Sequence, residues 1–252
     1  MAIVKTDGIV LHRADYRETS FLVRLMTADY GRICVQAKGA RRQKGKFGSS
    51  FLAGSRNTVV FYENAHAALH ILSQADMAEP FARISCSLDR FSYAAYFLEL
   101  VDSVLPWDEP NRSVYDLLHN CLHFLDQADI IEGILPLFEV KFLSLSGFKP
   151  RLDSCVHCSR IIDDESRFSY RFGGLLCARC YDNDAQAHAI LKGTIASVNH
   201  LESIPVDRIG IFRMDGPIRA QMCRLLRDFI DFHFGRQFRS LQFLNKVRFA
   251  YA

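Results

Sequence analysis

Four cysteines in two closely spaced pairs are the residues of this sequence best suited to chemistry. Cys155 and Cys158 form one C-x-x-C pair, and Cys177 and Cys180 form a second pair after 18 intervening residues. Each pair can bend so that its two thiolates hold one ion, and two pairs complete a tetrahedron with metal–sulfur distances of about 2.3 Å. Two such pairs at this spacing are typical of zinc sites. We therefore expect one zinc ion at these four cysteines.

The expected zinc is structural, because four thiolate ligands leave no open coordination position for water or substrate. We accordingly assign no catalytic residue. His157 and His188 are alternative ligands, and cysteines paired by chance in a protein core remain another interpretation. A redox-active C-x-x-C is less favoured, because that chemistry needs only one pair. Four further cysteines stand alone among apolar residues, as is usual in a reducing cytoplasm: Cys34, Cys86, Cys121 and Cys223.

A second candidate site is the basic segment 38–46 (KGARRQKGK), which contains no acidic residue. Uncompensated positive charges on a glycine-containing loop are typical of a surface that binds phosphates. The residues expected to contact nucleic-acid phosphates are Lys38, Arg41, Arg42, Lys44 and Lys46, and the basic residues that could extend this surface are Arg13, Arg17, Arg24 and Lys5. Four nearby aromatic residues are candidates for base stacking, although each is more readily explained as core: Tyr16, Tyr30, Phe47 and Phe51. The alternative for the whole segment is a solvated charge run that keeps the protein soluble.

The N-terminal 80 residues carry the basic excess and resemble a small barrel. They hold 11 Lys and Arg against 7 Asp and Glu, whereas residues 81–252 hold 20 against 21. Five β-branched runs, broken by turn residues such as Asp29–Gly31, predict strands at 8–13, 19–27, 31–39, 57–63 and 68–74. Five short strands favour a closed OB-fold barrel, whose usual ligands are oligonucleotides and oligosaccharides.

After Pro80 the apolar residues recur at helical spacing, which predicts a helical domain over residues 81–252 with a Cys-rich insert at 150–182. The helices are expected at 91–105, 111–127, 130–146, 186–203 and 216–235. Pro136 is expected to kink or split the third of them, and Pro217 fits the first turn of the last. The chain is therefore predicted to be an α+β protein of several modules.

Other sequence features argue against a membrane protein or an enzyme. No window approaches 18 consecutive apolar residues and the N-terminus is charged, so we expect a cytoplasmic protein. The segment from Gly39 to Lys46 differs from a phosphate-binding loop in spacing, and Phe47 stands where that motif needs a hydroxyl. His119 and His123 have metalloprotease spacing, but Asn120 replaces the catalytic glutamate.

Three separated parts of the chain resemble the RecO family of bacterial recombination mediators. The first is 8–42 (GIVLHRADYRETSFLVRLMTADYGRICVQAKGARR), and the second comprises LSLSGFKPRLDSCVHC and GGLLCARC around the cysteine pairs. The third is LLRDFIDFHFGRQFRSLQFL at 225–244. One departure is Ser159, which follows the first cysteine pair where the family pattern leads us to expect glycine.

The resemblance implies an N-terminal OB-fold, a helical domain that carries the zinc insert, and no enzymatic activity. It also implies binding of single- and double-stranded DNA, annealing of complementary strands, and replacement of single-strand-binding protein by RecA with the help of RecR. The family recognises the C-terminal tail of single-strand-binding protein and would work in the cytoplasm, at the nucleoid during repair. The alternatives are a zinc-stabilised structural adaptor whose barrel binds protein, and a zinc-ribbon enzyme that acts on nucleic acid.

Overall fold

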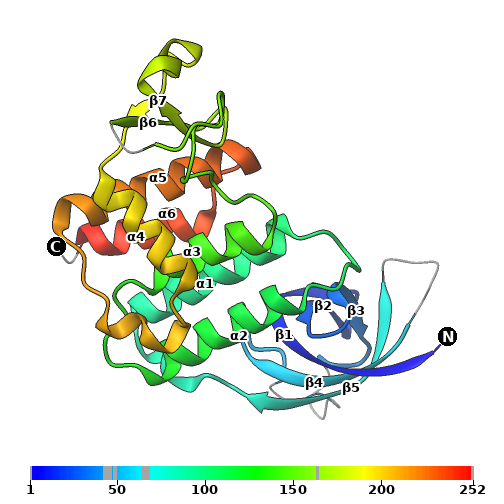
Figure 1. Ribbon diagram of the computed structural model, residues 1–252. Helices are drawn as coiled ribbons and strands as arrows, with labels where there is room; N and C mark the ends of the chain where they lie inside the picture. The colour runs from blue at the N-terminus through cyan, green and yellow to red at the C-terminus, as the bar shows by residue number, and fades with distance from the viewer. Residues whose placement is uncertain (1, 42–46, 48–49, 64–68, 163–164, 251–252) are drawn as a thin grey trace. The chain divides into compact units, whose positions relative to one another are not determined.

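The chain forms two compact units in a computed structural model that describes residues 2–41, 47, 50–63, 69–162 and 165–250 (Figure 1). The first unit contains residues 1–131 and 238–252, and the second contains residues 132–237. None of the helices in the described ranges combines the length and the apolar character that a membrane span requires.

The first unit is built on a closed barrel of five strands in the order β1-β2-β3-β5-β4. These are β1 (Ile3–Tyr16), β2 (Ser20–Thr27), β3 (Gly31–Ala37), β4 (Arg56–Tyr62) and β5 (His70–Glu79). Strands β3 and β5 pair in parallel, and the other neighbours pair antiparallel. The predicted five-stranded barrel is therefore confirmed.

Strand β1 is longer than predicted and closes the barrel by pairing on both edges. Residues 3–9 pair with β4, and residues 8–16 pair with β2, with an irregularity in register between Val10 and His12. Sequence reasoning missed the first part of the strand because exposed or half-exposed residues, including Lys5 and Asp7, outnumber the buried ones there. The C-terminal part of β1 and the start of β2 form a hairpin whose tip, residues 13–21, carries Arg13 and Arg17.

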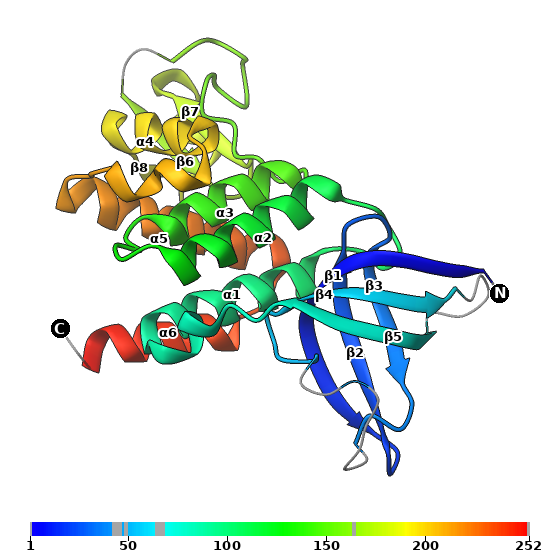
Figure 2. The same cartoon turned by 90° about the horizontal axis from the view of Figure 1, so that it is seen from below.

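Helices α1 (Leu88–Val104), α2 (Arg112–Gln127) and α6 (Arg239–Ala250), with the short η1 (Ala82–Cys86), complete the first unit. Both views place α6 beside α1 (Figures 1 and 2), and the Glu99 carboxylate accepts hydrogen bonds from the first backbone N–H groups of α6. Asp102 of α1 forms an ion pair with Arg24 of β2 at 3.0 Å. This arginine therefore stabilises the packing of a helix on the barrel.

The second unit contains the helices α3 (Ile134–Leu145), α4 (Lys192–Ser203) and α5 (Gly216–Phe234), and the short η3 (Val206–Ile211). The predicted helices are present, but the expected kink at Pro136 is wrong. Pro136 is the third residue of α3, where a backbone N–H would have no partner within the helix. The helix predicted from residue 186 begins only at Lys192, because residues 188–189 form a short strand instead. Helix α6 was not predicted.

Candidate functional site

Backbone pairing brings the two cysteine pairs together in a small sheet of the second unit. Strand β7 (Gly174–Cys177) pairs with β6 (Ser166–Ser169), and β6 pairs with β8 (His188–Ala189). The free edge of β7 is covered by the segment 151–156. The Leu175 N–H donates to the Arg151 carbonyl at 3.0 Å, and the Val156 N–H donates to the Leu175 carbonyl at 2.8 Å. The first cysteine pair therefore lies beside the end of β7, where the second pair begins.

Each cysteine pair lies in a tight turn. In the first, the Ser159 N–H donates to the Cys155 carbonyl at 2.8 Å, and Ser159 adopts a left-handed conformation with φ of 59°. Glycine tolerates this conformation best, which explains physically why glycine was expected at this position. In the second, Cys177 ends β7 and the short helix η2 (Ala178–Asn183) turns Cys180 back toward the first pair.

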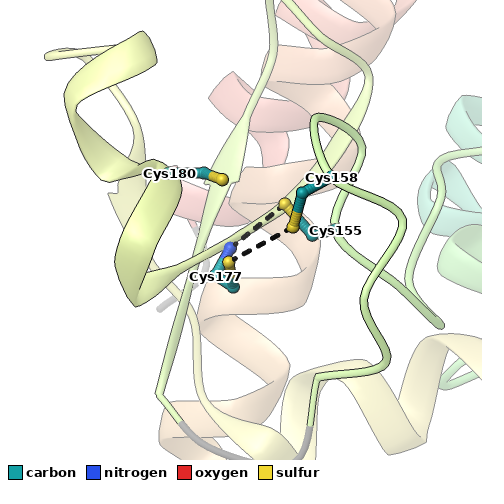
Figure 3. Close-up of side chains that lie close together, drawn as sticks. All are labelled: Cys155, Cys158, Cys177 and Cys180. Atoms are coloured by element: carbon teal, nitrogen blue, oxygen red, sulfur yellow. Dashed lines mark hydrogen bonds between the residues drawn. The ribbon is translucent and has the colours of Figure 1, made fainter.

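The four cysteine side chains gather at one place in the insert (Figure 3). All four lie within 4.8 Å of one another, and the Sγ atoms of Cys158 and Cys177 are 3.7 Å apart. A tetrahedral ion bound at about 2.3 Å would hold its sulfurs about 3.8 Å apart. A disulfide would bring two of them to about 2 Å, and all four cysteines are free. The cluster could therefore hold one metal ion.

Electrostatics in the cluster also suit a cation. Burial raises the pKa of the Cys155 thiol, but backbone N–H groups of Cys177, Cys158 and His157 point to its sulfur and bring the pKa down to about 6. Burial and the hydrogen-bonding neighbour sulfurs, with the charge of Cys155, raise the pKa of Cys180 to about 12. The negative charge of Cys155 thus opposes ionisation of Cys180, and a bound cation would compensate this charge.

The two histidines named as alternative ligands have different surroundings. The His157 Nδ1 atom is 3.7 Å from the Cys180 sulfur, at hydrogen-bond distance for a sulfur partner. The His188 ring instead packs against Tyr170, with ring centroids 5.6 Å apart. Among the described residues, the group of possible ligands contains the four cysteines and neither histidine.

Most of the described basic residues predicted to bind DNA gather at the tip of the β1–β2 hairpin. The Arg41 N–H donates to the Thr19 carbonyl at 3.1 Å, and its Nη1 atom donates to the Arg17 carbonyl at 3.2 Å. Lys38, directly after β3, lines a shallow groove together with Arg17. The Arg13 guanidinium lies over the ring of Phe21, 4.7 Å from its centroid. Arg42, Lys44 and Lys46 lie outside the described residues.

Sequence reasoning missed two side chains at the hairpin tip. One is Phe21, half-buried beneath Arg13, which has an aromatic face and a cation stacked on it. The other is Asp15, whose Oδ2 atom forms an ion pair with Arg41 Nη2 at 3.2 Å. Asp15 pairs directly with Phe21, so their side chains share one face of the hairpin. Strand alternation alone could not have shown this, because it does not give the register of β1 against β2. Of the suggested stacking residues, Phe47 and Phe51 are buried in the barrel core.

The metalloprotease-like histidine pair has a structural explanation in the first unit. His119 Nε2 is 3.0 Å from the Glu79 carboxylate, and its ring stacks on Tyr115. Glu79 in turn accepts hydrogen bonds from Arg56. His119 therefore belongs to a polar network that joins α2 to the barrel.

Comparison with known proteins covers nearly the whole chain. The family model described as recombination protein O N terminal matches residues 1–81, and the one described as recombination protein O C terminal matches residues 85–242. A DNA repair protein RecO from Alkaliphilus metalliredigens is 33% identical over 97% of this chain and 100% of its own length. The RecO protein of Symbiobacterium thermophilum is 31% identical over 99% of this chain and 100% of its own length. That of Halalkalibacterium halodurans is 27% identical over 96% of this chain and 94% of its own length.

Gly174 tests whether the contact between the 151–156 segment and β7 holds the cysteine cluster together. A Cβ atom there would lie 2.5 Å from the Arg151 carbonyl oxygen and 2.6 Å from a Val156 methyl. Gly174→Ala should therefore push the first cysteine pair away from β7, lower the thermal stability of the protein and weaken metal retention at least about tenfold in chelator competition.

Gly173→Ala is the matched control, because a Cβ at the neighbouring glycine meets nothing within 4 Å. Its φ of 70° adds only a backbone cost of about 1–2 kcal/mol. Equal metal retention by the two variants would contradict the proposed role of this contact.

Proposed function

This chain belongs to the RecO family of DNA repair proteins, and we propose that it binds single- and double-stranded DNA and anneals complementary strands. The observation that carries the proposal is the gathering of Arg13, Arg17, Lys38 and Arg41 at one end of an OB-type barrel. Barrels of this kind commonly bind oligonucleotides with the loop between their first two strands.

Phosphate contacts account for the proposed annealing without bond chemistry. Two complementary strands repel each other until their backbone charge is neutralised, and each basic side chain that binds a phosphate releases condensed counterions. The exposed Arg13 guanidinium, which lies over the half-buried Phe21 ring, offers a flat cationic face against which an unpaired base can pack. Such contacts are independent of sequence, as an annealing activity requires.

The same proposal assigns the modules and their partners. Residues 1–80 would be the DNA-binding module, and residues 81–252 the helical module with its insert at 150–182. Family membership supports cooperation with RecR, recognition of the C-terminal tail of single-strand-binding protein, and loading of RecA onto the strand that is cleared. These steps would take place in the cytoplasm at damaged DNA of the nucleoid.

We further propose that the metal is zinc and that it is structural. A four-sulfur tetrahedral set suits zinc or iron, and Cys155, Cys158, Cys177 and Cys180 would fill every coordination position of either ion. The ion would tie two turns together and thereby hold the sheet of the insert. No position would remain for a substrate, so the protein would act without catalysing a reaction.

Labelled complementary strands separate the candidate functions in one experiment. The proposal expects binding and accelerated annealing, with no consumption of ATP and no strand cleavage. If the protein binds no DNA, the structural adaptor becomes the better hypothesis. If purified protein cuts the strands or hydrolyses ATP, and a point variant loses that activity, the protein is an enzyme.

Salt dependence tests whether the basic surface binds phosphates. Each phosphate neutralised on a single strand contributes about −0.7 to the slope of log affinity against log salt. One contact from each of the five basic residues in segment 38–46 would therefore give a slope of about −3.5. Raising salt from about 50 to about 200 mM should then weaken binding about a hundredfold. The Arg41→Ala/Arg42→Ala variant should reduce the slope by about 1.4 and weaken all sequences alike, as measured by fluorescence anisotropy.

The control for that variant is Arg208→Ala/Arg213→Ala, which removes the same charge from exposed positions of the second unit. It should keep the slope of the unmodified protein. An unchanged affinity and slope in a well-folded Arg41→Ala/Arg42→Ala protein would mean that these arginines serve solubility only.

Elemental analysis tests the zinc assignment. We expect one zinc ion per chain, lost on Cys177→Ser and retained on Cys86→Ser, because Cys86 is exposed and lies outside the cluster. Metal affinity should fall as the pH is lowered, since protons compete with the ion for the sulfurs. Carefully purified protein without zinc, or full zinc content in Cys177→Ser, would be incompatible with the assignment.

A further inference from the structure

Asp15 places a carboxylate in the middle of the basic hairpin tip. Its side chain is 67% exposed, and its Oδ2 atom lies 3.2 Å from Arg41 Nη2. The same guanidinium donates from Nη1 to the Arg17 carbonyl, and the Arg41 backbone N–H donates to Thr19. Arg41 is therefore held against the β1–β2 turn, with one of its two terminal nitrogens directed to an acidic group.

This ion pair differs from those elsewhere on the barrel. Asp102 pairs with Arg24 where its own side chain is only 11% exposed, and Asp7 pairs with Arg56, which also binds Glu79. Those pairs join helices or strands to one another. In the pair of Asp15 and Arg41, by contrast, the side chains are 67% and 37% exposed, and an ion pair at such a surface contributes little stability.

A phosphate that approaches Arg41 must therefore replace Asp15 or share the guanidinium with it. If it shares, two negative groups lie within a few ångströms of each other, at a distance where salt screens their repulsion only partly. Either event lowers the net gain from the phosphate contact. The carboxylate acts on bound nucleic acid through Arg41 and leaves the other basic residues of the tip available.

We propose that Asp15 is an internal competitor for the nucleic-acid phosphate at Arg41, which limits affinity and speeds release of a bound strand. The inference rests on the proposed function, since it requires the hairpin tip to bind DNA. Its value to an annealing protein is direct: a strand held too tightly cannot leave once it has paired.

Asp15→Asn keeps the size of the side chain and removes its charge. The variant should bind a single-stranded oligonucleotide about two- to fivefold more tightly at about 50 mM salt, mainly through a slower dissociation rate. This difference in affinity from the unmodified protein should decrease as the salt concentration rises. Asp76→Asn is the matched control. It removes one carboxylate from an exposed position on β5 of the same barrel, where its partner is the uncharged Gln74, and should change affinity much less.

A double-mutant cycle with Arg41→Ala shows whether Asp15 acts through that arginine. In the Arg41→Ala background, the gain from Asp15→Asn should fall to that of the Asp76→Asn control. Unchanged or weaker binding by Asp15→Asn would overturn the inference, as would an equal gain with and without Arg41. If the unmodified protein binds no oligonucleotide, the proposed function fails as well, so the two failures are distinguishable.

Discussion

The double pairing of β1 is the constraint on which the first unit depends. A sheet of five strands has two open edges unless its two outer strands also pair with each other. Strand β1 provides this closure, because residues 3–9 pair with β4 while residues 8–16 pair with β2. Closure buries one face of every strand in a single core that includes Val10, Leu25 and Phe61. It also fixes where β1 continues beyond its pairing with β4, and that extension carries Arg13 and Asp15 and leads into the turn at Arg17.

Backbone pairing also positions the cysteine cluster of the second unit. Pairing of residues 151–156 with β7 sets two tight turns side by side, and the sulfurs meet because the backbone brings them together. The two candidate sites thus lie in different units. The second unit holds a site suited to one structural ion, while the first presents charged side chains on a strand extension whose position is fixed by barrel closure.

The sequence predicted those features that depend on local spacing. The cysteine pairs, the strand runs and the helical periodicity are short-range signals, and the barrel and helices follow from them. Asp15 and Phe21 were missed because their importance arises from contacts with Arg41 and Arg13, which only the folded hairpin creates. The kink assigned to Pro136 was wrong for a related reason, since the effect of proline depends on where the helix begins. These cases depend on the register of the hairpin and on the residue at which the helix begins, and the spacing of residue types along the sequence shows neither.

Amide hydrogen exchange with and without a single-stranded oligonucleotide tests most directly whether the barrel, and not the cysteine-rich insert, is the DNA-binding surface. The account predicts new protection at residues 13–21 and 38–41, where Arg13, Arg17, Lys38 and Arg41 gather. Exchange over residues 151–189 should stay unchanged, because the proposed ion there serves structure alone. Protection over 151–189 without any at the hairpin tip would contradict the account.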